Sequence, residues 1–357
     1  MSRLLVFLTY IMLIVSVVNF FTIRRPRKSI DIEDFISVIV PLRNEAHNIN
    51  GLLQSLKAQK YLKRVEFIFL DDNSEDLTYN LVTASISGRA DMQLIQGSPV
   101  PDGWIGKTWA LQQLFNASLG QIIVSLDADV RIKPDAINKA VTTLKSTGLN
   151  FISAYPRQIA LTLPERLIQP LLQWSWMTTL VLSIAERSSF SSMAVANGQF
   201  FVVHRSALVT SRGYEMVKAC VLDDVFLARV LVKSGSHGVV ISGAEIAECR
   251  MYESWRDIKA GYGKSLRYAF GSHLGSLFAV VFIFLTGIAP LILGVEGYAW
   301  GWIGYACVTS TRMLSAIRSK NRVFDSLFHP LSSALLIYLI FYSYFSREDI
   351  KWKGRTI

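Results

Sequence analysis

The segment Gln121-Ile122-Ile123-Val124-Ser125-Leu126-Asp127-Ala128-Asp129 decides the fold class. Its residues 122–126 have the apolar composition of a buried strand, and two carboxylates follow that strand directly. Three similar runs precede it, at residues 35–41, 65–70 and 93–96, and helical stretches separate all four runs. This alternation predicts an α/β domain that begins as the first half of a doubly wound parallel sheet.

Acidic side chains stand at the ends of two of these predicted strands. Asp127 and Asp129 follow one, and Asp71 and Asp72 follow another. Ligands of such sheets bind beyond the carboxyl ends of the strands. Two carboxylates at positions i and i+2 can share a hard divalent cation that bridges to phosphate oxygens, although the bare triplet is more often an ordinary turn. The Asp71-Asp72 segment fits a helix N-cap and a nucleoside contact equally well.

A third acidic pair, Asp223-Asp224, precedes an evident helix at residues 225–231. Carboxylates at a helix N-terminus are stabilised by the helix dipole, so capping explains them without any function. A general base that removes a proton from an acceptor hydroxyl needs the same residue type in a pocket. Both interpretations stay open on this pair alone.

Five motifs in fixed order together resemble the family 2 glycosyltransferases of the GT-A fold, over roughly residues 35–265. The motifs are Val40-Pro41-Leu42-Arg43-Asn44-Glu45, Asp71-Asp72-Asn73-Ser74, Gly106-Lys107-Thr108-Trp109-Ala110-Leu111, Asp127-Ala128-Asp129 and Leu222-Asp223-Asp224.

A narrower likeness lies with members that act on carotenoid acids or hopanoids, in particular the 4,4'-diaponeurosporenoate type. It is carried by Asp102-Gly103-Trp104-Ile105-Gly106-Lys107, Asn197-Gly198-Gln199-Phe200, Arg250-Met251-Tyr252, Gly261-Tyr262-Gly263-Lys264, His329-Pro330 and Trp352-Lys353-Gly354-Arg355.

The resemblance implies a binding site for a nucleotide-diphosphate sugar, most simply a UDP-hexose. By that resemblance Pro41, Asn44 and Glu45 line the nucleotide pocket, Asp72 contacts the uracil side of the donor, and Lys107 lies near the diphosphate. A lysine there would neutralise charge that builds on the leaving diphosphate.

The resemblance also implies the metal and the base. Asp127 would face the donor sugar, and Asp129, with Asp127, would hold a divalent metal, Mg²⁺ or Mn²⁺. Asp224 would be the catalytic base of an inverting displacement, with Asp223 beside it in the catalytic pair.

One departure from the family concerns processivity. Processive members carry Gln-x-x-Arg-Trp where this chain has Tyr252-Glu253-Ser254-Trp255-Arg256. We therefore expect a single sugar transfer rather than polysaccharide synthesis, with Trp255 and Arg256 as substrate contacts. The Asp223-Asp224 position is not uniform in the carotenoid type, which leaves a different lipid acceptor open.

Composition and charge indicate a membrane protein. The 357 residues are 51% hydrophobic with a net charge of +10, and the excess apolar residues lie at the two ends of the chain. Residues 4–21 carry no charge, and Arg24-Arg25-Pro26-Arg27-Lys28 follows them. A signal peptide has the reverse order, so this segment is predicted to be a retained anchor with the catalytic domain in the cytoplasm.

The expected layout is a multi-pass protein of the plasma membrane. It comprises an N-terminal transmembrane anchor (1–23), a GT-A domain (35–265) with a membrane-lying helix at about 167–184, a C-terminal membrane region (274–345) and a basic tail (346–357). Arg312, Arg318, Lys320 and Arg322 place their loop on the cytoplasmic side, but the side of the tail stays open.

The predicted partners are therefore a nucleotide-diphosphate sugar, a lipid acceptor and the membrane. A polyprenyl-phosphate sugar transferase or a small polysaccharide synthase is the alternative within the same fold. A non-catalytic domain that only binds nucleotide sugars would not need the full acidic set. Nucleic acid is not an expected partner, because basic residues are not enriched in the globular middle.

Overall fold

A seven-stranded sheet organises one of two compact units in the computed structural model. The structure describes residues 2–345, 351–352 and 355–356. The sheet unit comprises Arg24–Arg157, Ile184–Cys249 and Lys351–Ile357, and the helical unit comprises Met1–Ile23, Gln158–Ser183 and Arg250–Ile350. Each unit is thus built from separate stretches of the chain.

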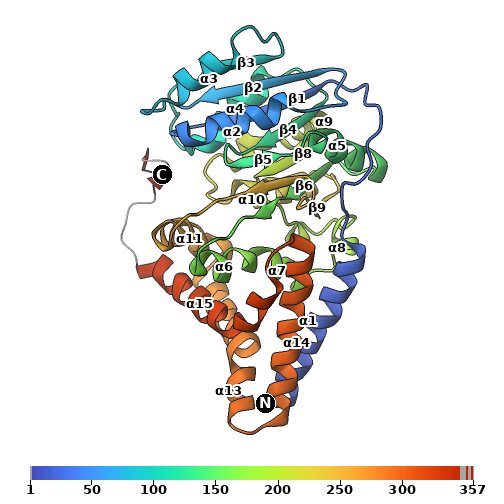
Figure 1. The fold of residues 1–357 in the computed structure, drawn as a ribbon, viewed down its shortest axis with the longest axis vertical. Coiled ribbons are helices and arrows are strands. Elements are labelled where there is room, and N and C mark those ends of the chain that lie inside the picture. Colours follow the sequence, from blue (N-terminus) through green and yellow to red (C-terminus); the bar gives the residue numbers. More distant parts are fainter. Residues whose placement is uncertain (1, 346–350, 353–354, 357) are drawn as a thin grey trace. The chain divides into compact units, whose positions relative to one another are not determined.

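The strand order of the large sheet is β3-β2-β1-β4-β8-β6-β9 (Figure 1). Its strands are β1 (Ile36–Leu42), β2 (Val65–Asp71), β3 (Met92–Gln96), β4 (Ile122–Leu126), β6 (Phe151–Tyr155), β8 (Phe200–His204) and β9 (Gly238–Ser242). The first four are parallel, which confirms the predicted α/β half. β8 runs antiparallel to both β4 and β6, so the complete sheet is mixed.

Helices of the sheet unit cover the strands with amphipathic faces. They are α2 (Ala46–Lys57), α3 (Thr78–Ile86), α4 (Gly106–Ala117), α5 (Ala136–Thr147), α9 (Arg205–Ser211) and α10 (Asp223–Lys233), with the short turns η1 (Ser191–Met193) and η2 (Gly213–Val217). In α2 the buried residues Ile49, Leu52, Leu53 and Leu56 repeat at helical spacing. β1, buried along its whole length, has the near-continuous apolar sequence of a central parallel strand.

A smaller sheet continues from the end of β4. β5 (Val130–Ile132) pairs antiparallel with β10 (Ala247–Cys249), and β7 (Arg157–Gln158) is the third strand of this sheet. β5 begins one residue after Asp129, so its pairing fixes the backbone on one side of the acidic turn. The described parts of the tail form β11 (Lys351–Trp352) and β12 (Arg355–Thr356). The remaining residues of the predicted basic tail lie outside the described part of the chain.

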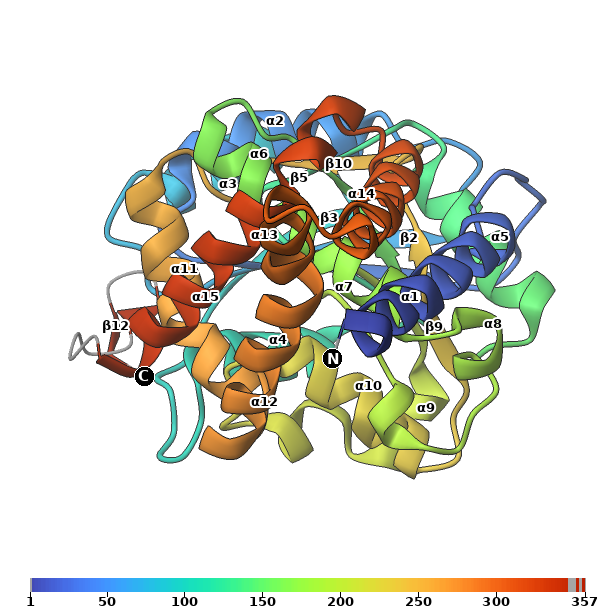
Figure 2. The same cartoon turned by 90° about the horizontal axis from the view of Figure 1, so that it is seen from below.

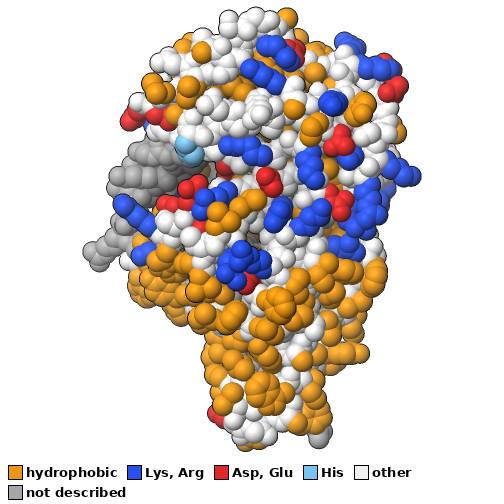
Figure 3. All heavy atoms as spheres, in the orientation of Figure 1, with side chains coloured by type: hydrophobic (Ala, Val, Ile, Leu, Met, Phe, Trp, Pro, Cys, Tyr) orange, Lys and Arg blue, Asp and Glu red, His pale blue; other side chains and the backbone are white. Residues whose placement is uncertain are grey.

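The helical unit contains long apolar helices. Its elements are α1 (Ser2–Thr22), α6 (Leu163–Ile168), α7 (Pro170–Thr179), α11 (Trp255–Ala269), α12 (His273–Ile283), the π-helical turn η3 (Phe284–Ile288), α13 (Ala289–Val295), α14 (Ala299–Ser319), η4 (Val323–Phe328) and α15 (His329–Phe345). α14 lies between α1 and α13 (Figures 1 and 2). Hydrophobic side chains cover the lower part of these helices on the face shown in Figure 3.

Three helical segments are long and apolar enough to cross a membrane: Leu5–Thr22, His273–Val295 and Val323–Phe345. The first overlaps the predicted anchor at 4–21, the other two overlap the predicted C-terminal membrane region at 274–345, and all three indicate a membrane-associated chain. α14, which lies in the same predicted region, does not meet these criteria within the described residues.

The single membrane-lying helix expected at about 167–184 is divided into several helices. α6 ends at Ile168, α7 begins at Pro170 and ends at Thr179, and α8 (Leu182–Ala185) follows after Leu180, whose backbone is extended. Pro170 has no N–H to continue the ladder of α6, which explains the first break. None of these helices has the roughly 20 residues that a span needs, and whether they lie on a membrane stays a prediction.

Candidate active site

The loops that follow β1 and β2 are tied together by hydrogen bonds. The Asn44 N–H donates to Ser74 Oγ (3.0 Å), and Asn44 Oδ1 accepts from the Glu75 N–H (2.8 Å). The Glu45 N–H, at the start of α2, donates to Thr78 Oγ1 (2.8 Å) at the start of α3. Asn44 has a left-handed backbone with φ of 51°, which asparagine tolerates better than most residues.

The buried side chain of Arg43 also links these two loops. Its guanidinium is buried and donates to the backbone carbonyl of Asp72 (2.6 Å), while the Asp72 N–H donates to the Leu42 carbonyl (2.8 Å). Pro41 is buried on β1, where it stands in register with Leu70 of β2. The predicted nucleotide residues therefore gather at the carboxyl edge of neighbouring parallel strands: Pro41 lies near the end of β1, and Asn44, Glu45 and Asp72 lie in the two cross-linked loops.

Lys107 and Asp127 form an ion pair at the next strand end. Lys107 lies in the first turn of α4, and its Nζ is 2.9 Å from Asp127 Oδ1 and 3.1 Å from Oδ2. Burial alone would lower the pKa of Lys107, but the charges of Asp127, Asp223 and Asp224 raise it well above the usual range. Lys107 is thus a fixed positive charge beside three carboxylates from two segments, the turn after β4 and the start of α10.

Asp129 carries an unusual buried carboxyl group. Its Oδ1 is buried and contacts no hydrogen-bond partner in the described structure. Burial raises the pKa of Asp129 to about 6, and the charges of Asp127 and Glu45 add to the rise, while Cys249 and Lys107 oppose it. Excess negative charge therefore gathers at the turn between β4 and β5.

Asp223 and Asp224 occupy the first turn of α10. Asp224 Oδ2 accepts a hydrogen bond from the Gly198 N–H (2.8 Å), and Oδ1 accepts one from the Val225 N–H (2.8 Å). Burial raises the pKa of both carboxyl groups, to about 6 for Asp223, while Lys107 opposes the rise in each case. The pair therefore does more than cap the helix, since Asp224 also contacts a neighbouring loop.

Gly198 brings Lys107 and Asp224 to one place. A Cβ atom built on Gly198 would lie 3.4 Å from Asp224 Cβ and 3.6 Å from Lys107 Nζ. The Gln199 carbonyl, one residue on, accepts from the Asp127 N–H (3.1 Å). The loop that leads into β8 therefore lies next to Lys107, Asp127 and Asp224.

Comparison with known proteins identifies the family that this chain resembles. Residues 37–210 match the model of glycosyl transferase family 2. The 4,4'-diaponeurosporenoate glycosyltransferase of Staphylococcus haemolyticus is 25% identical over 345 residues, which cover 90% of this chain and 88% of the relative. The chain is a glycosyltransferase whose residues 37–210 form a family 2 domain.

Two further similarities cover different lengths of the chain. A dolichol-phosphate mannosyltransferase of Saccharomyces cerevisiae is 32% identical over 122 residues, which cover 33% of this chain and 44% of the relative. A mannosyltransferase of Pyrobaculum calidifontis, solved in complex with GDP-Man and Mn²⁺, has a TM-score of 0.57 at 17% identity and covers 97% of this chain and 99% of its own. This last likeness confirms the predicted GT-A fold.

Residues that sequence reasoning did not select also belong to the site of this glycosyltransferase. Tyr214 of η2 is buried, hydrogen-bonds to Ser125 of β4 and lies within electrostatic range of Asp223, Lys107 and Asp127. Burial raises its pKa, so Tyr214 presents a neutral hydroxyl at physiological pH. Gly198 lies in the Asn197-Gly198-Gln199-Phe200 motif, which was given no role in the site, whereas no sequence signal distinguishes Tyr214.

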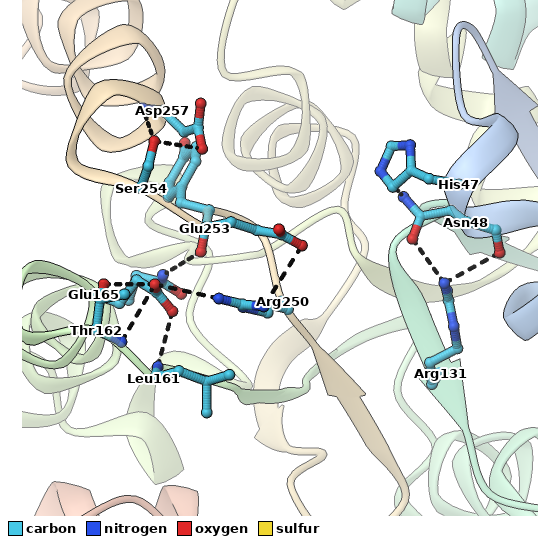
Figure 4. Close-up of polar contacts among 12 residues, drawn as sticks. His47, Asn48, Arg131, Leu161, Thr162, Glu165, Arg250, Glu253, Ser254 and Asp257 are labelled. Carbon is cyan, nitrogen blue, oxygen red and sulfur yellow. Dashed lines mark hydrogen bonds and ion pairs between the residues drawn. The ribbon is translucent and has the colours of Figure 1, made fainter.

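Arg131 supports the acidic turn from β5. Its Nη2 donates to Asn48 Oδ1 (2.7 Å) and to the Asn48 carbonyl (3.1 Å) (Figure 4). Its Nη1 donates to the Ala128 carbonyl (2.8 Å). A Cβ on Gly51 would come within 2.5 Å of the Arg131 side chain, so a glycine is needed at that point of α2. The Asp127–Asp129 turn is therefore anchored to α2.

Protein side chains at the site could supply only some of the ligands that a divalent cation needs. Within the described residues, no group of three or more His, Cys, Asp and Glu is arranged to hold a metal ion. Asp129 nevertheless has a buried oxygen without a partner, beside the charge of Asp127. Mg²⁺ commonly binds one or two protein carboxylates and completes its coordination with substrate phosphates and water, so this donor set fits such an ion.

Trp255 and Arg256 belong to the helical unit, at the start of α11. The Trp255 ring stacks on Tyr338 of α15 with centroids 6.1 Å apart, and Arg256 is exposed. Just before them Arg250 pairs with Glu165 (3.5 Å) and Glu253 (3.7 Å) (Figure 4). Their role as substrate contacts stays a prediction.

Glu165 is fully buried at the centre of this second cluster. It accepts hydrogen bonds from the Leu161 N–H (2.9 Å) and from Thr162 Oγ1 (2.6 Å), as part of a capping box that begins α6 (Figure 4). Burial alone would raise the pKa of Glu165, but these hydrogen bonds and Arg250 lower it, so the group is a carboxylate. The Arg250-Met251-Tyr252 motif is thus fixed to α6.

Proposed function

We propose that this glycosyltransferase transfers one sugar, with inversion, from a nucleotide-diphosphate sugar to a lipid acceptor in the membrane. The convergence of Lys107, Asp127 and Asp224 on Gly198 carries the proposal. It brings a fixed cation for a leaving diphosphate within reach of a carboxylate that can accept a proton. The donor is proposed to be a UDP-hexose.

Donor binding is assigned to the tied loops and to Lys107. The nucleoside would lie against Pro41, Asn44, Glu45 and Asp72, because these residues meet at the carboxyl edge of β1 and β2. Lys107 would hold the diphosphate by charge. The mannosyltransferase of similar fold is in complex with GDP-Man, which supports a nucleotide-diphosphate sugar as the donor class.

Asp129 and Asp127 are proposed to hold Mg²⁺ or Mn²⁺. When bound, the cation would supply positive charge to the diphosphate oxygens as the sugar–phosphate bond breaks. Asp129 suits this role because its Oδ1 has no other partner in the described chain. Asp127 would face the sugar while its other contacts orient Lys107.

Asp224 is proposed to be the general base. Two backbone N–H groups fix its carboxylate, so its orientation does not depend on substrate. Each oxygen keeps a lone pair that can accept the proton of an attacking hydroxyl or orient an attacking carboxylate. Asp223 would add negative charge that favours proton uptake by the pair.

A membrane lipid is the proposed acceptor. The relative that covers 90% of this chain is named for a carotenoid acid, and three segments of the chain can cross a membrane. Transfer of one sugar agrees with the Tyr252-to-Arg256 sequence, which lacks the pattern of processive members. We place the catalytic unit on the cytoplasmic side of the plasma membrane, on the basis of Arg24 to Lys28.

Lipid analysis tests this function. Lipid extracts of a deletion strain, the parent and a strain complemented with Asp224→Asn are compared by mass spectrometry. We expect one glycolipid to be missing from the deletion and Asp224→Asn strains, with a mass one hexose above that of an accumulating lipid. Accumulation of an unmodified polyprenyl phosphate would instead identify the alternative transferase, and loss of a polymer would contradict single transfer.

A further inference from the structure

Arg312 of α14 is a buried arginine without a hydrogen bond. Its side chain is 3% exposed, and within the described part of the chain its guanidinium donates to no acceptor. Nη1 in particular is fully buried and unpartnered. A guanidinium offers five N–H donors and stays charged, so burial without acceptors is strongly unfavourable unless something else pairs with it.

The nearest acid is already engaged with another arginine. Asp325 of η4 lies within electrostatic range of Arg312. However, Arg166 of α6 binds both oxygens of Asp325 in a fork, with Nε 2.9 Å from Oδ2 and Nη2 in contact with Oδ1. Two buried or half-buried guanidinium groups thus share one carboxylate, which leaves one positive charge uncompensated.

His329 provides a second unpartnered group nearby. It is fully buried at the start of α15, its Nε2 pairs with Ser333 Oγ (3.3 Å), and its Nδ1 has no partner among the described residues. Its ring lies 4.6 Å from that of Trp174, whose Nε1 donates to Thr311 Oγ1 (2.7 Å). Thr311 adjoins Arg312 in the sequence, and Arg312 lies within electrostatic range of His329. The two unpartnered side chains therefore belong to one centre.

The centre lies where lipid head groups are expected. Arg318, on the same helix, donates to the Phe20 carbonyl near the end of α1, and the exposed Arg322 follows just after the end of α14. Asp325 and His329 lie in the first turns of the candidate span Val323–Phe345. Phe324 of η4 is 81% exposed, so an apolar side chain projects outward beside the buried charge. Anionic lipids are attracted to basic groups at this depth.

We propose that Arg312, with His329, binds the anionic head group of a membrane lipid, through its phosphate or carboxylate oxygens. A guanidinium fork matches these planar or tetrahedral oxygen groups, and a neutral His329 Nδ1–H can donate to the same anion. The site is separate from the acidic site of the sheet unit and does not depend on the proposed transfer reaction.

The test measures thermal stability of the full-length protein in lipid nanodiscs. Discs contain phosphatidylcholine alone or mixed with phosphatidylglycerol of the same acyl chains. Wild type should melt at a higher temperature with phosphatidylglycerol, and Arg312→Gln should lose most of this difference. Arg322→Gln is the matched control, since it removes an exposed arginine next to the same cluster and should keep the difference.

Native mass spectrometry of wild type in detergent gives a second readout that needs no variant. Wild type should retain phosphatidylglycerol roughly tenfold or more tightly than phosphatidylcholine, as loss of a charge-assisted hydrogen bond implies. If Arg312→Gln does not fold, Arg312→Lys replaces it in this measurement, because lysine keeps the positive charge but lacks the two-pronged donor geometry of the guanidinium. It should bind more weakly than wild type.

Three outcomes would overturn the proposal. Equal retention of both lipids by wild type would show that the centre selects no anionic head group. An unchanged stability difference in Arg312→Gln would locate the lipid effect elsewhere. If inorganic phosphate added to phosphatidylcholine discs reproduces the whole effect and phosphatidylglycerol adds nothing, the anion is a free ion rather than a lipid.

Discussion

Asp129 ends the acidic turn with a buried carboxyl oxygen, Oδ1, that has no hydrogen-bond partner among the described residues. We predict that Asp129→Ala lowers metal-dependent transfer by about a hundredfold or more, because a metal contributes several kcal/mol of charge stabilisation. The melting temperature should not fall, since the change removes a buried charge rather than a contact. The check is transfer rate against Mg²⁺ or Mn²⁺ concentration. Near-normal activity at limiting metal would contradict the assignment.

The Asp224 carboxylate accepts hydrogen bonds from two backbone N–H groups, and its proposed role differs from that of Asp223. Separate variants of the two residues therefore test the assignment of the base. Asp224→Asn keeps the shape and one of the two oxygens but loses proton acceptance, so we predict a fall of about 10²- to 10⁴-fold in transfer rate. Nucleotide affinity should be preserved, because the proposed contacts are Asp72, Lys107 and Asp129. Asp223→Asn should keep more activity. A dead Asp223→Asn with an active Asp224→Asn would exchange the two roles.

Acid pH should inactivate the enzyme through this pair. Asp223 faces Lys107, Asp224 and Asp127, and burial raises its pKa to about 6. A raised carboxyl pKa means that the pair takes up a proton as pH falls through about 6, so a base is lost below that pH and present above it. We predict that kcat/KM falls with acidity around pH 6. A flat profile from pH 5 to 8, measured with saturating metal, would argue against a carboxylate base here.

At the scale of elements, the tie between the β1–α2 and β2–α3 loops is the feature to test. Thr78→Val removes the hydroxyl that accepts the Glu45 N–H and leaves this donor buried at the start of α2. We predict a loss of about 1–3 kcal/mol in unfolding free energy and a higher KM for the donor. Thr83→Val on the exposed side of α3 is the control, because Thr83 bonds only within its own helix. Equal effects in both variants would contradict the role of the tie.

Most of the regular elements of the sheet unit could be predicted from the sequence. β4 was predicted at 122–126 and has those bounds, since five apolar residues before a polar turn specify a buried strand. The antiparallel insertion of β8 between β4 and β6 could not be predicted, because pairing depends on long-range contacts that apolar runs do not encode. The same holds for Gly198 and Tyr214, which reach the site only through that pairing and through η2. The acidic residues were visible because charge directly after a buried strand is unusual.

At the scale of the whole molecule, the helical unit has two distinguishable ends. Gly304 of α14 lies beside Leu5 of α1, while Arg318 contacts the Phe20 carbonyl, so α1 and α14 run in the same direction. The turn before α14 is therefore at the end opposite to the basic residues. Exposed Tyr298, Trp300 and Trp302 near that turn are the residue types that favour a membrane–water interface.

We predict that the turn at Glu296 faces outward and that the catalytic unit faces the cytoplasm. Ser87→Cys is exposed in the sheet unit, and Glu296→Cys lies in the turn between α13 and α14. A membrane-impermeant maleimide added to intact cells should label Glu296→Cys and not Ser87→Cys, with wild type as the background. Labelling of Ser87→Cys in intact cells would overturn the topology.

The partition of the chain into interleaved segments has a consequence for how the protein is made. α1 leaves the ribosome first, yet its main partner α14 begins at Ala299, and its other partner α7 begins at Pro170. At synthesis rates of about 5–20 residues per second, α1 waits in the membrane for roughly 15–60 s before α14 exists. The Asn19 side chain of α1, which finally donates to the carbonyls of Met177 and Leu180, lacks these acceptors until α7 has been made. Expression of the catalytic segment alone, cut before Leu274, would leave α1 with α7 but permanently without α14, so co-expression of residues 270–357 as a separate polypeptide is the rational route to rescue it.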